Sequence, residues 1–368
     1  MITKVLSIIG TRPEAIKMAP VIKELNESDL IDHRLCITSQ HKEALMEVVN
    51  FFNLEVNYDL DIMKKNQSLF EITIKILSKL EQVLEIEKPD MVLVHGDTTT
   101  SFVASLASFY KKIMIGHIEA GLRTHNKFEP FPEEINRKLV DSISDFYYAP
   151  TQLAKENLIN EGVKQKKIFV TGNTVVDAVE LCLDRIEEKS LSFINQFQKA
   201  KNKKNILLTT HRRENFGKPL ENICDAIIEI SNNEIYHIFC PVHPNPNVKN
   251  YIYERFQNIN NITLLDPLKY PEFLFLMSKS DIIISDSGGV QEEAPSLNKK
   301  VIILRNFTER PEGLDSGHLY IAGTEKKSII KVFNKILSSK PIVDKNPYGN
   351  GDASKKIRSH IESLNVEK

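Results

Sequence analysis

Residues 91–117, MVLVHGDTTTSFVASLASFYKKIMIGH, decide the fold class. An apolar run at 91–96 predicts a buried strand, residues 99–110 have a helical pattern, and residues 113–117 predict a second strand. A strand, a helix and a strand in this order join parallel strands, whose sheet is covered by helices on both faces. The stretch therefore predicts an α/β protein.

The same alternation runs along the whole chain. In the first half we expect further strands at 4–10, 34–39, 146–149 and 168–171, and helices at 42–52, 69–87 and 132–143. In the second half we expect strands at 205–210, 237–241, 262–265, 282–285 and 301–304, and helices at 220–231, 272–279 and 326–338. The restart after residue 204 predicts a second sheet.

A chain of 368 residues is long for one compact unit and natural for two. We predict two Rossmann-like domains, 1–185 and 186–368, with their sheets facing across a cleft, and place the linker in the charged segment 187–204. The amphipathic segment 352–364 predicts a final helix. The sequence does not fix which domain this helix packs on, and packing back on the first domain is one option.

The composition excludes several classes of protein. Lys and Arg number 48 against 49 for Asp and Glu, so no basic surface for a nucleic acid is expected. Cys36, Cys182, Cys224 and Cys240 form no metal-ligand spacing, and we expect them to be reduced, which suits a cytoplasmic protein. No apolar run approaches the ~18 residues of a membrane span.

Ligands of open parallel sheets bind beyond the carboxyl ends of the strands. The first strand ends at Gly10, and Arg12 follows at the start of a helix, a place that favours anions. Lys17 lies near enough to add positive charge. An ordinary capped turn between strand and helix is the alternative interpretation of this motif.

Three acids follow strands or open a helix in the first half: Asp97, Glu119 and Glu133. Taken singly, Asp97 is explained as a helix cap and Glu133 as an acid in a first helical turn. Taken together, they place three carboxyl groups at the same edge of one domain. Converging carboxyl groups are what acid–base catalysis requires.

The second half presents cations and glycines at the corresponding edge. His211, Arg212 and Arg213 follow its first strand, in a solvated turn or beside a diphosphate. In SDSGGVQEEAP, residues 285–295, two glycines between a strand and a helix allow backbone N–H groups to approach a phosphate. A tight glycine-rich turn is the alternative.

Two cofactor motifs are absent from the sequence. No GxGxxG follows the first strand, so a nicotinamide cofactor is not expected, and no GxxxxGK[ST] is present, which disfavours ATP-driven chemistry. We expect no cofactor and no metal. The residues alone thus predict a two-domain protein that holds an anionic nucleotide in its second half and presents acids from its first.

The motifs together resemble those of the non-hydrolysing UDP-N-acetylglucosamine 2-epimerase family. The similar segments, in the same order from about residue 4 to 351, are GTRPEAIKMAP (10–20), HGDTTT (95–100), GHIEAGLRT (116–124), PFPEEINR (130–137), TGNTVVDA (171–178), HRRENFG (211–217), PVHPNPNV (241–248), DSGGVQEEAPSL (286–297) and TERPEG (308–313). A set of this length and order is highly specific.

The resemblance implies a GT-B-like fold, a homodimer, no cofactor, and a place in surface polysaccharide or glycan assembly. It also implies interconversion of UDP-GlcNAc and UDP-ManNAc: anti elimination of UDP gives 2-acetamidoglucal, and UDP then adds back with inversion at C2. Proton transfer falls to Asp97, Glu119 and Glu133, with Arg12 and His211 assisting the diphosphate and Lys17 beside them. The resemblance assigns further contacts to the nucleotide: Leu268 and Phe273 near uracil, Ser287, Gly288, Gly289 and Glu293 as the diphosphate and ribose cradle, and Arg310 as a further ligand.

Some bacterial members bind a second UDP-GlcNAc as an activator, and Gln40, Gln67 and His243 fit that pattern. Glu43 and Asn66 differ from the Gln and Arg of those members. Other functions remain open as alternatives: an epimerase of a related UDP-2-acetamido sugar, the hydrolysing branch that releases free ManNAc, a GT-B glycosyltransferase, and a non-enzymatic UDP-sugar sensor.

Overall fold

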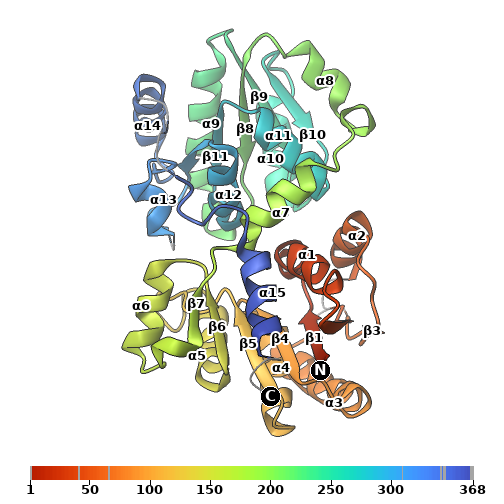
Figure 1. Ribbon diagram of the computed structural model, residues 1–368. Helices are drawn as coiled ribbons and strands as arrows, with labels where there is room; N and C mark the ends of the chain where they lie inside the picture. The colour runs from red at the N-terminus through yellow and green to blue at the C-terminus, as the bar shows by residue number, and fades with distance from the viewer. Residues whose placement is uncertain are drawn as a thin grey trace. The chain divides into compact units, whose positions relative to one another are not determined.

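The computed structural model describes residues 2–39, 42–64, 67–308, 310–339, 342 and 345–364. The chain forms two compact units, one made of the residues up to Leu181 and those from Tyr348 onward, and one made of Cys182–Pro347. Each unit is built on one parallel sheet (Figure 1). Among the described residues, no helix is both long and apolar enough to cross a membrane.

The sheet of the first unit has the strand order β3-β2-β1-β4-β5-β6-β7, and every neighbouring pair is parallel. Its strands are β1 (Thr3–Ile9), β2 (Ile31–Ile37), β3 (Tyr58–Asp59), β4 (Met91–His95), β5 (Met114–Ile118), β6 (Phe146–Ala149) and β7 (Ile168–Val170). The strand order reverses between β1 and β4, because the chain builds outward from β1 in one direction and then returns to build in the other.

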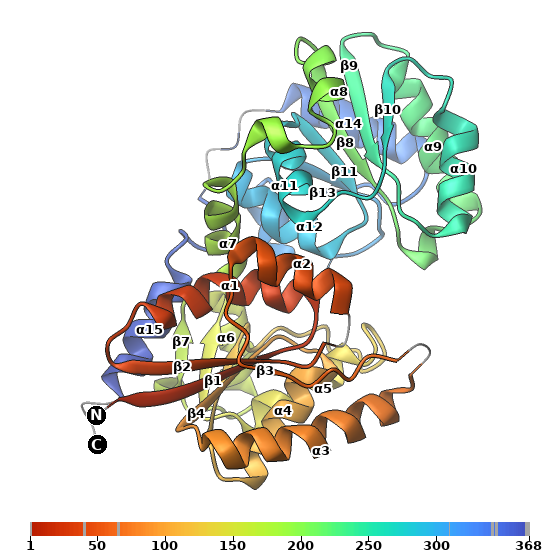
Figure 2. The same ribbon diagram turned by 90° about the vertical axis from the view of Figure 1, so that its right-hand side faces the viewer.

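Helices cover both faces of this sheet. They are α1 (Arg12–Asn26), α2 (Lys42–Phe52), α3 (Leu69–Glu87), α4 (Thr99–Tyr110), α5 (Glu133–Ile143), α6 (Gln152–Asn160), α7 (Thr174–Leu183) and α15 (Ala353–Ser363). Figure 2 shows α1 and α2 on one face and α3, α4 and α5 on the other. The longest, α3, shows why these segments are helical: Ser68 and Glu71 cap each other's backbone N–H groups, and apolar residues at helical spacing, such as Ile76 and Leu80, are buried.

The predicted C-terminal helix is α15, and it packs on the first unit. Arg358 pairs with Glu24 of α1 at 2.7 Å, and the Ser28 hydroxyl donates to Glu362 at 2.6 Å. The ring of His360 lies 3.8 Å from that of Phe169, centroid to centroid. Residues far apart in the chain thus complete one compact unit.

The second unit has the strand order β10-β9-β8-β11-β12-β13, again all parallel. Its strands are β8 (Lys204–Thr209), β9 (Tyr236–Pro241), β10 (Ile262–Leu265), β11 (Ile282–Ser285), β12 (Lys300–Ile303) and β13 (Leu319–Ile321). Its helices are α8 (Ile194–Lys199), α9 (Lys218–Ser231), α10 (Pro246–Phe256), α11 (Tyr270–Lys279), α12 (Gly288–Glu293), α13 (Pro311–Asp315) and α14 (Lys326–Ser338). Ile206 and Leu208 of β8 belong to one apolar core and Leu207 to another, so both faces of the sheet are buried.

The interpretation of 187–204 as a linker is wrong. The segment holds α8 and enters β8, and the side chains of Leu191, Phe193 and Ala200 are buried in a core of the second unit. The segment resembles a linker because it is highly charged and its three buried apolar residues form no regular pattern. The main chain passes from one unit to the other earlier, between Leu181 and Cys182 of α7.

In each sheet the direction in which strands are added reverses at one point. This switch point lies between β1 and β4 in the first sheet and between β8 and β11 in the second. At such a switch point the loops after two neighbouring strands diverge, which leaves room for a ligand beyond their carboxyl ends. The sequence motifs that begin at Gly10, His95, Thr210 and Ser285 follow these four strands. The fold therefore presents the predicted chemistry where ligands of such sheets bind.

Candidate active site

Glu14 fixes the loop that follows β1. Its buried carboxylate accepts hydrogen bonds from the N–H groups of Gly10 and Thr11, at 3.0 and 2.7 Å, and from the hydroxyls of Thr98 and Ser101, at 2.8 and 3.0 Å. Burial raises the pKa of Glu14, and these four bonds oppose the rise. Glu14 thereby ties the β1–α1 loop, where α1 begins, to the β4–α4 loop.

Only glycine fits at position 10. A Cβ atom there would lie 2.2 Å from the Thr100 hydroxyl oxygen and 2.4 Å from that of Thr38, well inside van der Waals contact. The backbone of the first loop can therefore lie directly against its neighbours at the switch point. Arg12 follows as the first residue of α1, partly buried, where the helix N-terminus favours an anion.

Glu119 follows β5 and has a backbone φ of +67°, a region that a residue with a side chain seldom adopts. Its carboxylate pairs with the ammonium of Lys17 in α1. It also accepts a hydrogen bond from the Asn173 amide at 3.0 Å, and Nε2 of His95 lies 3.8 Å away. The strained backbone is thus held in place by partners from three other segments.

Asp97 lies at the end of the β4 segment and is held through both its side chain and its backbone. Its carboxylate pairs with Arg137, and its carbonyl oxygen accepts a hydrogen bond from the Asn136 amide at 2.9 Å. Burial raises the pKa of the Asp97 carboxyl; Arg137 opposes the rise, and the charge of Glu119 adds to it. An acid whose pKa is raised gives up and takes a proton closer to neutral pH.

The structure decides against the cap interpretation of Asp97. Thr98 is the N-cap of α4, and its hydroxyl accepts a hydrogen bond from the N–H of Ser101 at 3.1 Å. The Asp97 side chain is therefore available for another role. The first-turn interpretation of Glu133 agrees with its position, since Glu133 is the first residue of α5.

The start of α5 is connected to the other two acids. Asn136 and Arg137, which bind Asp97, lie one turn after Glu133. The neighbouring Glu134 is fully buried and accepts hydrogen bonds from the N–H groups of Thr124 and His125, at 3.0 and 3.1 Å. Asp97 and Glu119 lie beside each other, and Glu133 opens the helix that holds Asp97.

In the second unit, Asp286 organises the loop after β8. Its carboxylate is fully buried and accepts hydrogen bonds from the Thr210 hydroxyl at 2.8 Å, the N–H groups of His211 and Arg212 at 3.0 Å each, and the Asn215 amide at 2.8 Å. Nδ1 of His211 lies 3.1 Å from the same carboxylate. Burial acts to raise the pKa of Asp286, but these contacts hold it at about 2, so the group is a permanent anion.

Two guanidinium groups lie beside the glycine pair. An atom at the Cβ position of Gly288 would be 3.6 Å from Arg310 and 3.7 Å from Arg212. Arg212 also donates to the Asp286 carbonyl oxygen at 2.9 Å, and Arg310 pairs with Glu292 at 2.7 Å. Ser287 is the N-cap residue of the short helix α12. The arginines and the helix start concentrate positive charge at one loop, which suits an anion.

The remaining predicted contacts lie in the same unit. Leu268 and Phe273 are partly buried and pack on the core that lies under α11, while Glu293 is buried at the end of α12. The exposed His243 follows β9, and its ring lies 5.9 Å from that of His211, centroid to centroid.

Two further predicted residues belong to the candidate activator site. Gln67, which precedes α3, accepts a hydrogen bond from the N–H of Lys64 at 2.7 Å. Gln40 lies outside the described residues. The activator role of Gln40, Gln67 and His243 stays a prediction.

Several residues of the site were quoted in motifs but given no role. Asn136 and Arg137 follow Glu133 at helical spacing, and that spacing could have placed them beside it. Asn173 and Asp286 gave no such signal, since their partners Glu119 and His211 are distant in the chain. Across the described residues, no group of three or more His, Cys, Asp or Glu side chains is placed to hold a metal ion.

The protein has two α/β units, each built on one parallel sheet with the residues above near its switch point. This arrangement and the solved structures it resembles place the protein in the class of nucleotide-sugar enzymes with a GT-B-like fold. The family model of UDP-N-acetylglucosamine 2-epimerases matches residues 23–362. The chain belongs to this family. An epimerase is an isomerase, so the protein is an enzyme of that class.

The relatives agree over almost the full length. The UDP-N-acetylglucosamine 2-epimerase of Neisseria meningitidis is 48% identical over 375 residues, covering 98% of this chain and 99% of the relative. A crystal structure from that organism, bound to UDP-GlcNAc, matches with a TM-score of 0.89, 48% identity and coverage of 98% and 100%. The Methanocaldococcus jannaschii enzyme in complex with UDP-GlcNAc and UDP matches with a TM-score of 0.84, 37% identity and the same coverage.

The role of Asp286 predicts a loss of stability in Asp286→Asn. An amide cannot replace a carboxylate that accepts from four donors, so the free energy of unfolding should fall by about 1.5–3 kcal/mol at pH 7. Because the folded pKa lies near 2, below the unfolded value of about 3.9, the contribution is present above pH 4 and is lost as the pH falls towards 2.

Urea unfolding followed by circular dichroism measures this loss. Asp266→Asn is the matched control, because Asp266 is exposed in the same unit, and its stability should equal that of the unchanged protein. Equal stability of Asp286→Asn and the unchanged protein at pH 7 would contradict the role of the carboxylate.

Proposed function

We propose that the protein interconverts UDP-GlcNAc and UDP-ManNAc. The observation that carries the proposal is the placement of Asp97 and Glu119 beside each other at the switch point, each with its own cationic partner. Relatives with solved structures bind UDP-GlcNAc and UDP, which supports the same ligands here. Inversion at C2 needs acid–base groups for both faces of the sugar ring.

The reaction that we propose begins with anti elimination. A carboxylate removes the proton from C2, the C1–O bond breaks, and its electron pair leaves with UDP, so that a C1–C2 double bond forms in 2-acetamidoglucal. UDP then adds back to C1 while a carboxylic acid delivers a proton to C2 from the opposite face. The C2 hydrogen is not acidic, so its removal has to be coupled to the departure of a stabilised leaving group.

We propose that the first unit supplies the proton-transfer groups Asp97, Glu119 and Glu133, with no assignment of each to a face of C2. Lys17 pairs with Glu119, so we propose that it orients this carboxylate as well as adding charge near the diphosphate. The raised pKa of Asp97 suits a group that is protonated in one half of the reaction.

We propose that the second unit holds the UDP moiety. Arg310, Arg212 and the N–H groups of residues 287–289 would meet the diphosphate, which gains charge as it leaves, and Arg12 and His211 would assist it. Glu293 would bind the ribose, and Leu268 and Phe273 would lie near uracil. The side chain of Leu268 cannot form a hydrogen bond, so any polar contact there comes from its backbone.

We further propose that the protein is a homodimer. The exposed apolar side chains Phe70 and Ile74 of α3 and Tyr110 of α4, which are 81%, 65% and 64% exposed, support an association surface on these two adjacent helices. Analytical ultracentrifugation measures the mass, and a monomer at micromolar concentration would contradict this.

The reaction predicts deuterium at C2. When the enzyme acts on UDP-GlcNAc in deuterated water, NMR should show UDP-ManNAc and deuterium at C2 of both sugars. A glycosyltransferase would leave C2 unlabelled, the hydrolysing reaction would release free ManNAc, and an enzyme for another UDP-sugar would leave UDP-GlcNAc unchanged.

Loss of any proton-transfer group should slow the same reaction. Asp97→Asn, Glu119→Gln and Glu133→Gln should each lower kcat by about 10²-fold or more. Glu156→Gln, which changes an exposed carboxylate of α6, is the control and should keep full activity. Near-normal turnover in all three variants would contradict the assignment of these acids to proton transfer.

Arg12→Ala should weaken UDP as a product inhibitor by about tenfold to a hundredfold, because one charge-assisted bond to the diphosphate is lost. Arg34→Ala, which removes a surface arginine paired with Asp32 at 2.7 Å, is the control. Inhibition and turnover unchanged in Arg12→Ala would exclude this role for Arg12.

A further inference from the structure

His117 lies in β5 two residues before Glu119, and none of its side chain is exposed. One ring nitrogen, Nε2, lies 2.8 Å from the carbonyl oxygen of Gly96. The other, Nδ1, lies 2.6 Å from a carboxylate oxygen of Asp141 in α5. The ring therefore joins the loop after β4 to the helix that begins with Glu133.

The two partners of His117 are of different kinds. The Gly96 carbonyl oxygen only accepts hydrogen bonds, so Nε2 of His117 donates to it. The Asp141 carboxyl holds the other ring nitrogen and so fixes the orientation of the buried ring.

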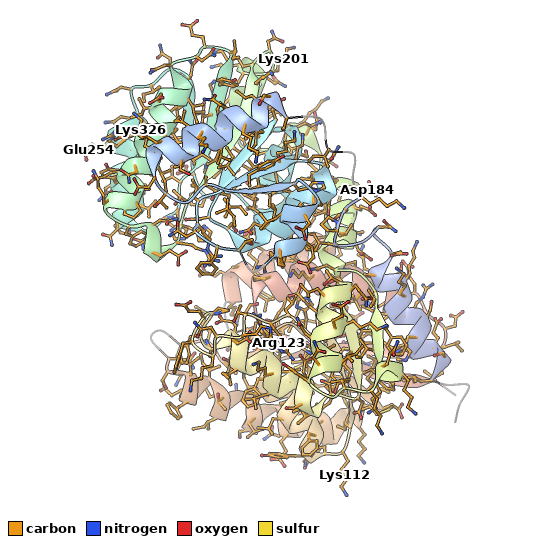
Figure 3. The ribbon with its side chains drawn as sticks, turned by 90° about the vertical axis from the view of Figure 1, so that its left-hand side faces the viewer. Lys112, Arg123, Asp184, Lys201, Glu254 and Lys326 are labelled. Carbon is orange, nitrogen blue, oxygen red and sulfur yellow. The ribbon has the colours of Figure 1, made fainter. Side chains whose placement is uncertain are left out.

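The Asp141 carboxyl that holds His117 has a second partner. Arg123 donates to the other oxygen of Asp141 at 2.7 Å, and it also pairs with Glu161 at 2.5 Å. Burial acts to raise the pKa of Asp141, but His117 and then Arg123 lower it below its usual range, so Asp141 stays ionised. His117, Asp141, Arg123 and Glu161 therefore form one connected set of contacts that runs from the buried ring to the exposed Glu161. Figure 3 labels Arg123 in this set.

This set of contacts acts on the backbone that carries Asp97. The Gly96 carbonyl belongs to the peptide bond that joins Gly96 to Asp97, and the Gly96 N–H donates to Ile118 at 2.9 Å. On the other side, the Asp97 carbonyl is held by Asn136. Gly96 has a φ of +63°, so the chain turns sharply here, and His117 fixes the direction in which Asp97 leaves the turn.

We propose that His117 is a positioning residue whose Nε2–H orients the Gly96–Asp97 peptide and so places the Asp97 carboxyl for proton transfer at C2. The inference rests on the proposed function of Asp97. It assigns no contact with substrate to His117. A displacement of about 1 Å in a reacting group can cost about 10²-fold in rate, which sets the size of the expected effect.

Two substitutions separate the two hydrogen bonds. The side-chain amide of glutamine reaches about as far as Nε2 of histidine, and that of asparagine about as far as Nδ1. His117→Gln keeps a donor for the Gly96 carbonyl, whereas His117→Asn keeps one only for Asp141. We expect His117→Asn to lower kcat by about tenfold to a hundredfold and His117→Gln to lower it clearly less.

The inhibition constant of UDP should not change in either variant, since the proposed grip on UDP lies elsewhere. His33→Asn is the matched control, because His33 is also buried in the first unit and hydrogen-bonded at both ring nitrogens, to Asn26 and Ser7. It should keep the normal kcat. Equal losses of kcat in the two His117 variants, or no loss in His117→Asn, would overturn the proposal.

A double-variant comparison separates this inference from the proposed function. If His117 acts through Asp97, then His117→Asn should cause no further loss in an Asp97→Asn background. Normal activity of Asp97→Asn alone means that the proposed function has failed. A slow Asp97→Asn that is slowed again by the same factor means that the positioning inference has failed.

A measurement on the unchanged protein keeps the proposal testable if the variants do not fold. NMR of protein labelled with nitrogen-15 in its histidines should show a proton on Nε2 of His117 that is hydrogen-bonded to the Gly96 carbonyl. An Nε2 without a proton would overturn the inference.

Discussion

Carboxylates that share a site repel one another, and the first unit is arranged around this constraint. Asp97 and Glu119 each have a cation from a neighbouring helix, Arg137 from α5 and Lys17 from α1. The environments differ, because the pKa of Asp97 is raised by its burial, while Glu119 has Lys17 and Asn173 as direct partners. Two acids with different environments are what a reaction with two opposite proton transfers needs.

In the second unit the charges are reversed, because a buried carboxylate holds a loop that carries cationic side chains. Its buried anion, Asp286, orients the loop that carries His211 and Arg212. The cations Arg212 and Arg310 then lie at Gly288. One unit thus places acids beside each other and the other places guanidinium groups at a glycine-rich loop. This arrangement suits the proposed removal of a proton and departure of a diphosphate.

The sequence predicted the fold class and most strands and helices, because buried parallel strands and their covering helices have clear apolar patterns. It did not name the short strands β3 and β13, nor the helices α6, α7, α8, α10 and α13. In α8 the reason is clear, because three apolar residues stand in a charged segment. The sequence also did not predict the order of the strands within each sheet. The order decides that the loops after β1 and β4 adjoin, and a single sequence does not record which strands pair.

The candidate site residues could be picked from their motifs, but their contacts could not. Lys17 was placed beside the diphosphate because of its charge and its position in α1. The structure shows that the Lys17 ammonium group pairs with the carboxylate of Glu119, 102 residues away in the sequence. The bond of His117 to Gly96 is of the same kind, since it joins β5 to the loop after β4, a contact that local sequence spacing does not reveal.

In the proposed mechanism, the sugar and UDP separate completely and rejoin within one enzyme molecule. Positional isotope exchange tests this most directly, with UDP-GlcNAc that carries oxygen-18 in the atom bridging C1 and the β-phosphorus. Released UDP can rejoin through any of the three terminal oxygens of its β-phosphate, so the label should spread into the non-bridging positions as epimerisation proceeds. Epimerisation with the label confined to the bridge would contradict the account.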